Sequence, residues 1–243
     1  MTTFSFKPSA FIALNMLAFL LIASWSGSVT REYWDILDRW MFNISNASLG
    51  NDVFTWLMAA LSIRLADLVT LVIILGFFYL KDAIFAQQNR LSGLVGFVLT
   101  LVLMLFVREL LDLYVEIVNL NRASPTAVID SAVRLSLLYP NFSLKDIAGD
   151  SFPGDHAAVL FTWLGYSLFF TRNKYSIAIA LLVILFSLPR FMAGAHWFSD
   201  IAVGGLSVTL IALAFALYTP LLNNPQKNLS KIANNILNRI FKK

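Results

Sequence analysis

The 243-residue sequence contains no cysteine, few charged residues and only two histidines. Without cysteine, the protein has no disulfide bond, no thiolate metal site and no cysteine nucleophile. Charged residues make up 13% of the chain and hydrophobic residues 58%. Soluble domains average about 25% charged and about 45–50% apolar residues. The composition therefore excludes an ordinary soluble globule or a disordered chain, and it indicates an all-α integral membrane protein.

Six hydrophobic stretches approach the ~20 apolar residues that cross a bilayer. We expect spans at 10–24, 66–80, 91–107, 157–170, 175–188 and 201–218. The first resembles a signal peptide in length, but no clean cleavage site precedes Trp25, so we interpret it as an uncleaved span. The third is expected to continue as a helix through Val118. The last carries small residues suited to close helix packing, namely Gly204, Gly205 and Ser207.

Short interfacial helices are expected beside the six spans. Residues 31–52 are polar and aromatic, and Trp34 and Trp40 suit a membrane interface. Residues 53–61 are apolar but too short to cross, so we interpret them as an interfacial or re-entrant piece. The apolar segment that follows is broken by two charged residues, Arg64 and Asp67.

The distribution of charge predicts the orientation. Six spans place both termini on one side, together with ten of the 18 basic residues and one of the 14 acids. The positive-inside rule makes that side cytoplasmic. In the tail, residues 227–243, basic residues alternate with apolar ones at helical spacing: Leu229, Ile232, Ile236, Ile240 and Phe241. This pattern predicts an amphipathic helix on the anionic inner leaflet, with a solvated basic tail as the alternative.

Both histidines fall at the outer ends of predicted spans, beside charged residues. His156 precedes the fourth span, and His196 lies between the fifth and sixth, with Arg190 six residues before it and Asp200 four residues after it. If the chain is helical from Trp197, Asp200 lies one turn from His196 on the same face. A carboxylate there can accept a hydrogen bond from one ring nitrogen and leave the other free as a nucleophile or base.

A phosphate site is one interpretation of this polar face. Arg122 follows the third span, where its guanidinium could meet that of Arg190, and a guanidinium offers a planar fork for phosphate oxygens. The alternative is that both arginines extend to lipid headgroups. Spacing alone does not separate the two. The outer segment 119–155 is too short for a domain, and a loop of this length is more often functional than idle.

These residues carry a family resemblance. The sequence resembles the type 2 phosphatidic acid phosphatase superfamily of membrane phosphatases, whose motifs are K-(six)-R-P, P-S-G-H and S-R-(five)-H-(three)-D. The third motif is matched at Arg190, His196 and Asp200, with Pro189 in place of the serine. The order of the motifs and the six-span layout agree over essentially the whole chain, so we expect residues 1–243 to form a single domain of this type.

The first two motifs depart from the pattern. The second is matched at Pro153 and His156, with Gly154 and Asp155 in place of its serine and glycine. In the first, Arg122 matches, Val115 stands where the lysine is expected, and Pro125 comes three residues after Arg122. The variants R-A-S-P and F-P-G-D-H are similar to the inner-membrane lipid A phosphotransferase branch of the superfamily.

The resemblance implies a substrate pair and a location. Phosphate would pass from undecaprenyl diphosphate to the 1-phosphate of lipid A (Kdo-lipid A), giving lipid A 1-diphosphate and undecaprenyl phosphate. The site would lie at the periplasmic face of a bacterial inner membrane, with membrane lipids as partners and no nucleic acid. A plain lipid phosphatase acting on undecaprenyl diphosphate or lipid A 1-phosphate is the alternative enzyme. A non-enzymatic lipid transporter is the alternative of another class.

The residues fit roles in this reaction. His196 would attack phosphorus and form a phosphohistidine, while Asp200 orients its ring. Arg122 and Arg190, with backbone amides around Gly154, would bind the phosphate oxygens. His156 would act as general acid and then general base.

Further candidates lie nearby, and some could replace the missing lysine: Asp155, Ser124, Lys145 and Arg108. Arg108, Asp112 and Glu116 also follow one another at helical spacing. We favour contacts between these side chains on a solvated helix end over a role in substrate binding. We expect no cofactor and no metal, although Asp146, Asp150 and Asp155 could in principle bind a divalent cation.

Overall fold

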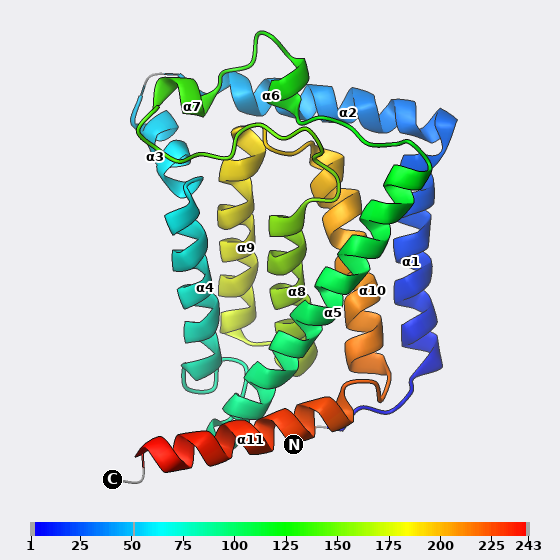
Figure 1. Ribbon diagram of the computed structural model, residues 1–243, viewed down its shortest axis with the longest axis vertical. Coiled ribbons are helices and arrows are strands. Elements are labelled where there is room, and N and C mark those ends of the chain that lie inside the picture. Colours follow the sequence, from blue (N-terminus) through cyan, green and yellow to red (C-terminus); the bar gives the residue numbers. More distant parts are fainter. Residues whose placement is uncertain (1–2, 51, 242–243) are drawn as a thin grey trace.

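The computed structural model describes residues 3–50 and 52–241, and this part of the chain is helical without any extended β-strand. A bundle runs between the two ends of the molecule, with α5 crossing the other helices obliquely (Figure 1). Its members are α1 (Pro8–Ser26), α4 (Arg64–Tyr79), α5 (Arg90–Ile117), α8 (Asp155–Phe170), α9 (Lys174–Met192) and α10 (Leu206–Tyr218). A π-helical turn, η2 (Asp200–Gly205), leads into α10. The predicted all-α class is confirmed, and each expected span falls on one of these helices.

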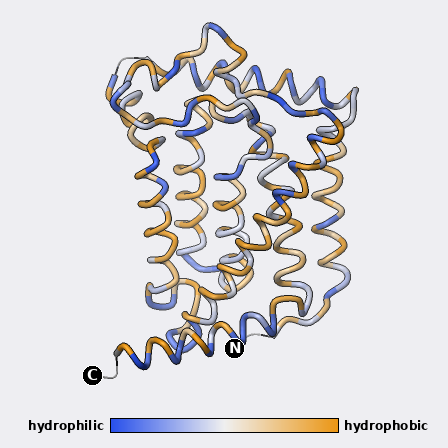
Figure 2. The backbone as a smooth tube through the Cα atoms, viewed as in Figure 1, coloured by the Kyte–Doolittle hydropathy of each residue, from blue (hydrophilic) through white to orange (hydrophobic). Residues whose placement is uncertain are grey.

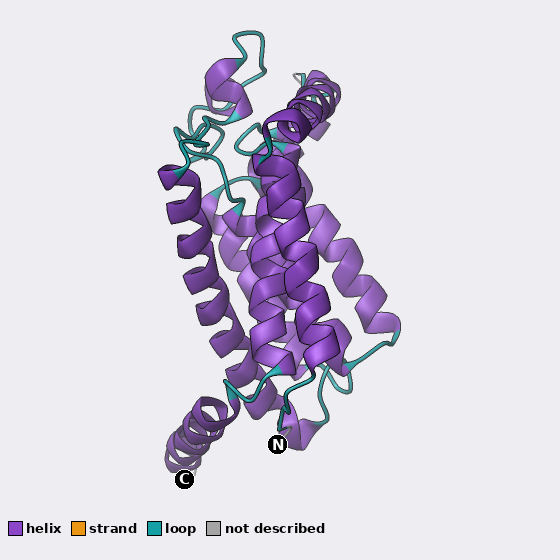
Figure 3. Ribbon diagram, turned by 90° about the vertical axis from the view of Figure 1, so that its right-hand side faces the viewer, coloured by secondary structure: helices purple, strands orange, loops and turns teal. Residues whose placement is uncertain are grey.

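Shorter and polar helices cover the two ends of the bundle. At one end lie α2 (Ser28–Ala47), α3 (Val53–Leu61), α6 (Pro125–Val128) and α7 (Leu135–Leu138). The other end carries η1 (Gln87–Asn89) and α11 (Asn223–Phe241). Figures 1 and 3 show α2 and α11 lying across opposite ends. The Asp52 side chain caps α3 by accepting a hydrogen bond of 2.8 Å from the Thr55 amide.

The expected count of six spans is only partly met by helix length. Four helices are long and apolar enough to cross a membrane, at Pro8–Ser26, Gln87–Ile117, Lys174–Met192 and Asp200–Tyr218. The helices α4 and α8 have 16 residues each, which makes them ~24 Å long against a hydrocarbon core of ~30 Å. α8 is short because the loop before it turns down into the bundle (Figure 1). Apolar residues dominate the middle of the bundle and polar residues its two ends (Figure 2).

Both marked termini lie at the same end of the bundle (Figure 1). The Lys7 amide donates a 3.0 Å hydrogen bond to the carbonyl of Tyr218 at the end of α10. The predicted tail helix is confirmed as α11, which packs on α5 through Gln226, whose Nε2 donates to the Ser92 carbonyl at 2.8 Å. Its apolar stripe is exposed at Leu229, Ile232, Ile236 and Ile240. The side chain of Phe241, and Lys242 and Lys243, lie outside the described residues.

Small residues let the last helix approach its neighbours closely, as expected from the sequence. Ser207 is buried, and its hydroxyl donates to the Ala18 carbonyl of α1 at 3.3 Å. A Cβ atom on Gly204 would lie 2.9 Å from Cα of Pro153. Beside this contact the rings of Trp25 and Phe152 stack with centroids 3.8 Å apart. The loop that carries the second motif is therefore pressed against the start of the last helix.

The substitution Gly204→Ala should destabilise the fold by about 1–3 kcal/mol, because the new methyl group meets backbone atoms that cannot turn away. Gly76→Ala in α4 is a matched control, since nothing lies within 4 Å of its Cβ position. That control should stabilise the helix by about 0.5–1 kcal/mol. Thermal unfolding in detergent measures both changes. Equal shifts in the unfolding temperature would contradict the packing described here.

Candidate active site

A polar cavity of about 480 Å³ opens at the end of the bundle opposite the termini. Its lining includes both histidines together with Arg190, and also Ser62, Arg64, Asp67, Lys145, Asp155 and Val159. These side chains come from the turn between α3 and α4, from α4 itself, the loop after α7, the start of α8, the end of α9 and the turn before η2. The predicted meeting of the second and third motifs is therefore observed.

His196 is buried and its ring is oriented by a backbone carbonyl. Its Nδ1 lies 2.8 Å from the carbonyl oxygen of Ser151, which can only accept a hydrogen bond. Nδ1 therefore carries the proton, and the lone pair of Nε2 remains free. The Asp200 carboxylate lies 3.7 Å from Nδ1, too far for a hydrogen bond. The expectation that Asp200 accepts from the ring is thus corrected, because its Oδ2 binds the Trp197 amide at 2.7 Å instead.

Arg122 is bound by acidic side chains and does not line the cavity. Its Nη1 donates to Asp38 at 2.7 Å, and its Nη2 donates to Asp200 at 2.6 Å and to the Ser199 hydroxyl at 2.5 Å. It lines a second, smaller pocket beneath α2 instead. The expectation that Arg122 and Arg190 form one phosphate clamp is therefore not met. The geometry makes Arg122 the residue that holds Asp200.

Asp38 was missed by the sequence analysis. It is 1% exposed, accepts hydrogen bonds of 2.7 Å from the amide and the hydroxyl of Ser199, and pairs with Arg122. Burial raises the pKa of the Asp38 carboxyl above its ordinary value, although Arg122 acts against this rise. Burial alone would lower the pKa of Arg122, but Asp200 and Asp38 outweigh it and raise that pKa. Asp38 gave no signal in the sequence, because it sits among several charged residues of an amphipathic segment.

Asp67 connects the other histidine to Arg190. One carboxylate oxygen lies 2.5 Å from Nη2 of Arg190, and the other lies 3.6 Å from Nδ1 of His156. Nε2 of His156 lies 3.2 Å from the carbonyl oxygen of Phe186. The sequence held a signal for Asp67, since an acid in an apolar helix is a functional hypothesis by default.

Gly154 does not supply an amide to the cavity. Its N–H donates to the carbonyl of Asp200 at 3.0 Å, and a Cβ there would lie 3.0 Å from the same oxygen. Gly154 is thus needed for the close approach of two backbones, and its predicted phosphate contact is corrected. Asp155, which follows it, is fixed by a 2.8 Å hydrogen bond from Nε of Arg108. Arg108 also pairs with Glu109 at 2.6 Å, and its predicted contact with Asp112 is longer, at 3.6 Å.

The remaining candidates separate into structural and cavity residues. Ser124 is fully buried, and its hydroxyl accepts from the Ala148 amide at 2.9 Å, so it holds the loop together. Lys145 is exposed and lines the cavity. Val115, at the position of the missing motif lysine, is buried in an apolar cluster with Trp25. A side chain at that position does not point into the cavity.

The acids considered for a divalent cation have other partners. Asp146 is buried and accepts from the Ser136 amide at 2.8 Å, while Asp150 accepts from Asn121 at 2.8 Å. Among the described residues, no group of three histidine or acidic side chains is arranged to hold a metal ion.

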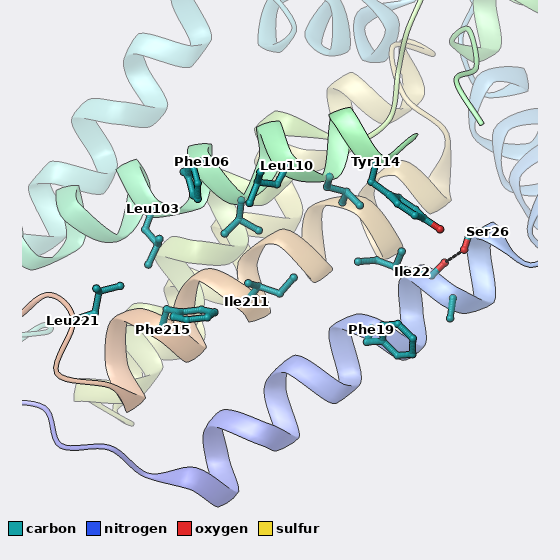
Figure 4. A pocket seen from close by; sticks show the side chains of 13 residues that line it. Phe19, Ile22, Ser26, Leu103, Phe106, Leu110, Tyr114, Ile211, Phe215 and Leu221 are labelled. Carbon is teal, nitrogen blue, oxygen red and sulfur yellow. Dashed lines mark hydrogen bonds between the residues drawn. The ribbon is translucent and has the colours of Figure 1, made fainter. Parts of the chain in front are cut away.

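Two apolar cavities accompany the polar one. A groove of about 220 Å³ between α4 and α9 shares Asp67 and His156 with the polar cavity and continues it with residues such as Leu65 and Val69. A larger groove of about 660 Å³ is lined by α1, α5 and α10 and contains no charged side chain (Figure 4). The chemistry therefore belongs to the polar cavity, whose apolar continuation is suited to a hydrocarbon chain.

Asp38→Ala should destabilise the protein by about 3–5 kcal/mol, because it breaks the buried ion pair with Arg122 and leaves the Ser199 amide without an acceptor. Asp35→Ala is the matched control on the same helix, since that carboxylate is half exposed and 3.4 Å from Arg122. The control should change stability by less than about 1 kcal/mol. Unfolding temperatures in detergent test the pair, and similar losses in both variants would refute the proposed network.

Comparisons with known proteins identify relatives of this chain. Residues 93–224 match the PAP2 superfamily. Over 217 residues, the chain is 35% identical to the lipid A 1-diphosphate synthase of Escherichia coli (strain K12), covering 86% of this chain and 87% of that protein. No solved structure matches the chain. The family and this relative support an enzyme of the phosphotransferase or phosphatase type. The chain therefore belongs to the PAP2 superfamily.

Proposed function

We propose that the protein is a lipid phosphotransferase that moves the terminal phosphate of undecaprenyl diphosphate to the 1-phosphate of lipid A. The observation that carries the proposal is His196, which lines a cation-rich cavity with its Nδ1 proton engaged and its Nε2 lone pair free. The relative named lipid A 1-diphosphate synthase supports lipid A as the acceptor. The apolar groove beside the cavity supports substrates that carry hydrocarbon chains.

In the first half-reaction, Nε2 of His196 attacks the terminal phosphorus and the bond to the bridging oxygen breaks. The electron pair leaves on the oxygen of undecaprenyl phosphate, which takes a proton from His156. Arg190 offsets the charge on the transferred group through the N–H donors that Asp67 does not occupy. The imidazolium formed at His196 is stabilised by the Ser151 carbonyl and by the nearby Asp200 carboxylate.

In the second half-reaction, an oxygen of the lipid A 1-phosphate attacks the phosphorus. The bond from phosphorus to Nε2 breaks, and the electron pair returns to the His196 ring. The acceptor phosphate enters with one proton, and His156, now neutral, accepts that proton as the new bond forms. Lipid A 1-diphosphate leaves, and the enzyme returns to its starting state.

The same proposal includes a topology for the whole chain, residues 1–243, as a single membrane domain. All six bundle helices cross a bacterial inner membrane, both termini are cytoplasmic, and the site faces the periplasm. The cavity and the termini at opposite ends of the bundle support this arrangement. The exposed apolar stripe of α11, with Lys227 and Lys231 beside it, supports a tail that lies on the inner leaflet.

His196→Ala should abolish transfer, because it removes the nitrogen lone pair that would form the bond to phosphorus. Purified protein is incubated with undecaprenyl diphosphate labelled at its terminal phosphate, with and without lipid A. In the unsubstituted protein the label should appear on lipid A. Free phosphate as the main product would indicate a hydrolase. Full turnover in a correctly folded His196→Ala variant would eliminate the proposed nucleophile.

His156→Ala should slow transfer by about 10²–10⁴-fold, the usual contribution of a general acid. The defect should shrink with nitrophenyl phosphate as donor, because that leaving group departs without a proton. Initial rates with the two donors provide the comparison. If the loss is the same with both donors, His156 does not protonate the leaving group.

A further inference from the structure

The acidic residues of the polar cavity are already paired, whereas two of its cationic residues are not. Asp67 binds Arg190 at 2.5 Å, and Asp155 binds Arg108 at 2.8 Å. Arg64 and Lys145 line the same cavity without an ion pair to any carboxylate of the described residues. Arg190, with both histidines, belongs to the group that handles the transferred phosphate. The cavity therefore holds two additional cations that the single-phosphate chemistry does not use.

The position of Arg64 is fixed by its helix. It begins α4, three residues before Asp67, so the two side chains lie on the same face about one turn apart. Asp67 in turn lies 3.6 Å from His156, the group placed to protonate the leaving oxygen. Arg64 thus lies on the histidine side of α4, beyond Asp67 toward the open end of the cavity. Lys145 reaches the same cavity from the loop after α7.

In each half-reaction of the proposed mechanism, a second phosphate lies next to the transferred group, on the side of Arg64 and Lys145. In an in-line displacement the leaving oxygen departs opposite Nε2 of His196, and the attacking oxygen of the acceptor must approach along the same line. Both the leaving lipid phosphate and the acceptor phosphate carry negative charge next to the transferred group. Water as acceptor would bring no such charge. A transferase therefore needs cations at this position in both half-reactions, whereas a hydrolase of the same diphosphate needs them only in the first.

We propose that Arg64 and Lys145 form a second phosphate subsite. It holds the leaving lipid phosphate in the first half-reaction and the acceptor phosphate in the second. The ligand is a phosphate monoester or the inner phosphate of a diphosphate, attached to a hydrocarbon chain. The role of the subsite in transfer rests on the proposed function. Its ability to bind a second phosphate can be tested by binding measurements alone. Arg64 precedes residues 93–224, so the matched family segment does not supply it.

The test compares the binding of farnesyl diphosphate with that of farnesyl monophosphate by the purified full-length protein in detergent. The unsubstituted protein should prefer the diphosphate by about tenfold or more, since the second phosphate gains charge-assisted hydrogen bonds from Arg64 and Lys145. The double variant Arg64→Gln/Lys145→Gln should lose that preference. Arg64→Lys should retain much of it, because the charge remains. Arg172→Gln removes one positive charge at the opposite end of the bundle and should leave the preference unchanged.

An unchanged preference in the double variant, or none in the unsubstituted protein, overturns the subsite. Binding requires no turnover, so this failure is distinct from failure of the proposed function. If the diphosphate preference depends on Arg64 and Lys145 but no label ever reaches lipid A, the subsite stands and the transferase proposal falls. If transfer occurs, the double variant should raise the KM for the phosphorylated acceptor by about tenfold or more.

Discussion

The site depends on the hydrogen bonds that the guanidinium of Arg122 donates to Asp38, Ser199 and Asp200. They join helix α2, the loop after α5 and the turn that begins the last helix. Each buried ion loses several kcal/mol of hydration, which is regained only if the geometry is close and the remaining polar atoms are satisfied. Both buried carboxylates meet this condition, since each also accepts a backbone amide hydrogen bond.

Arg122 also positions His196 through its backbone. The Ser151 amide donates to the carbonyl of Arg122 at 3.0 Å, and the Ser151 carbonyl holds His196. The side chain of Arg122 fixes Asp200, whose carbonyl accepts the Gly154 amide at the start of α8. One arginine thus fixes the loop before His156 and the turn after His196. The two histidines owe their relative placement to a residue that does not line their cavity.

Much of the fold and part of the site could be predicted from sequence. Hydrophobic runs located all six bundle helices, and motif spacing located His156, His196 and Arg190. The partners of these residues could not be predicted, because they arise from contacts between distant segments. Asp38 lies 84 positions from Arg122, and Asp67 lies 123 positions from Arg190. Spacing also could not show that the Ser151 carbonyl, which every residue type would offer, takes the hydrogen bond expected of Asp200.

The short lengths of α4 and α8 affect how deep the polar cavity lies in the membrane. At 16 residues each, these helices fall ~6 Å short of a ~30 Å hydrocarbon layer. If their lower ends are level with the inner edge of that layer, the floor of the polar cavity lies below the outer headgroups. In the proposed reaction, a lipid phosphate would then have to move below the headgroups of its neighbours, or the bilayer would have to thin around α4 and α8, before its phosphorus could reach His196. The local thickness of the membrane thereby becomes part of substrate access.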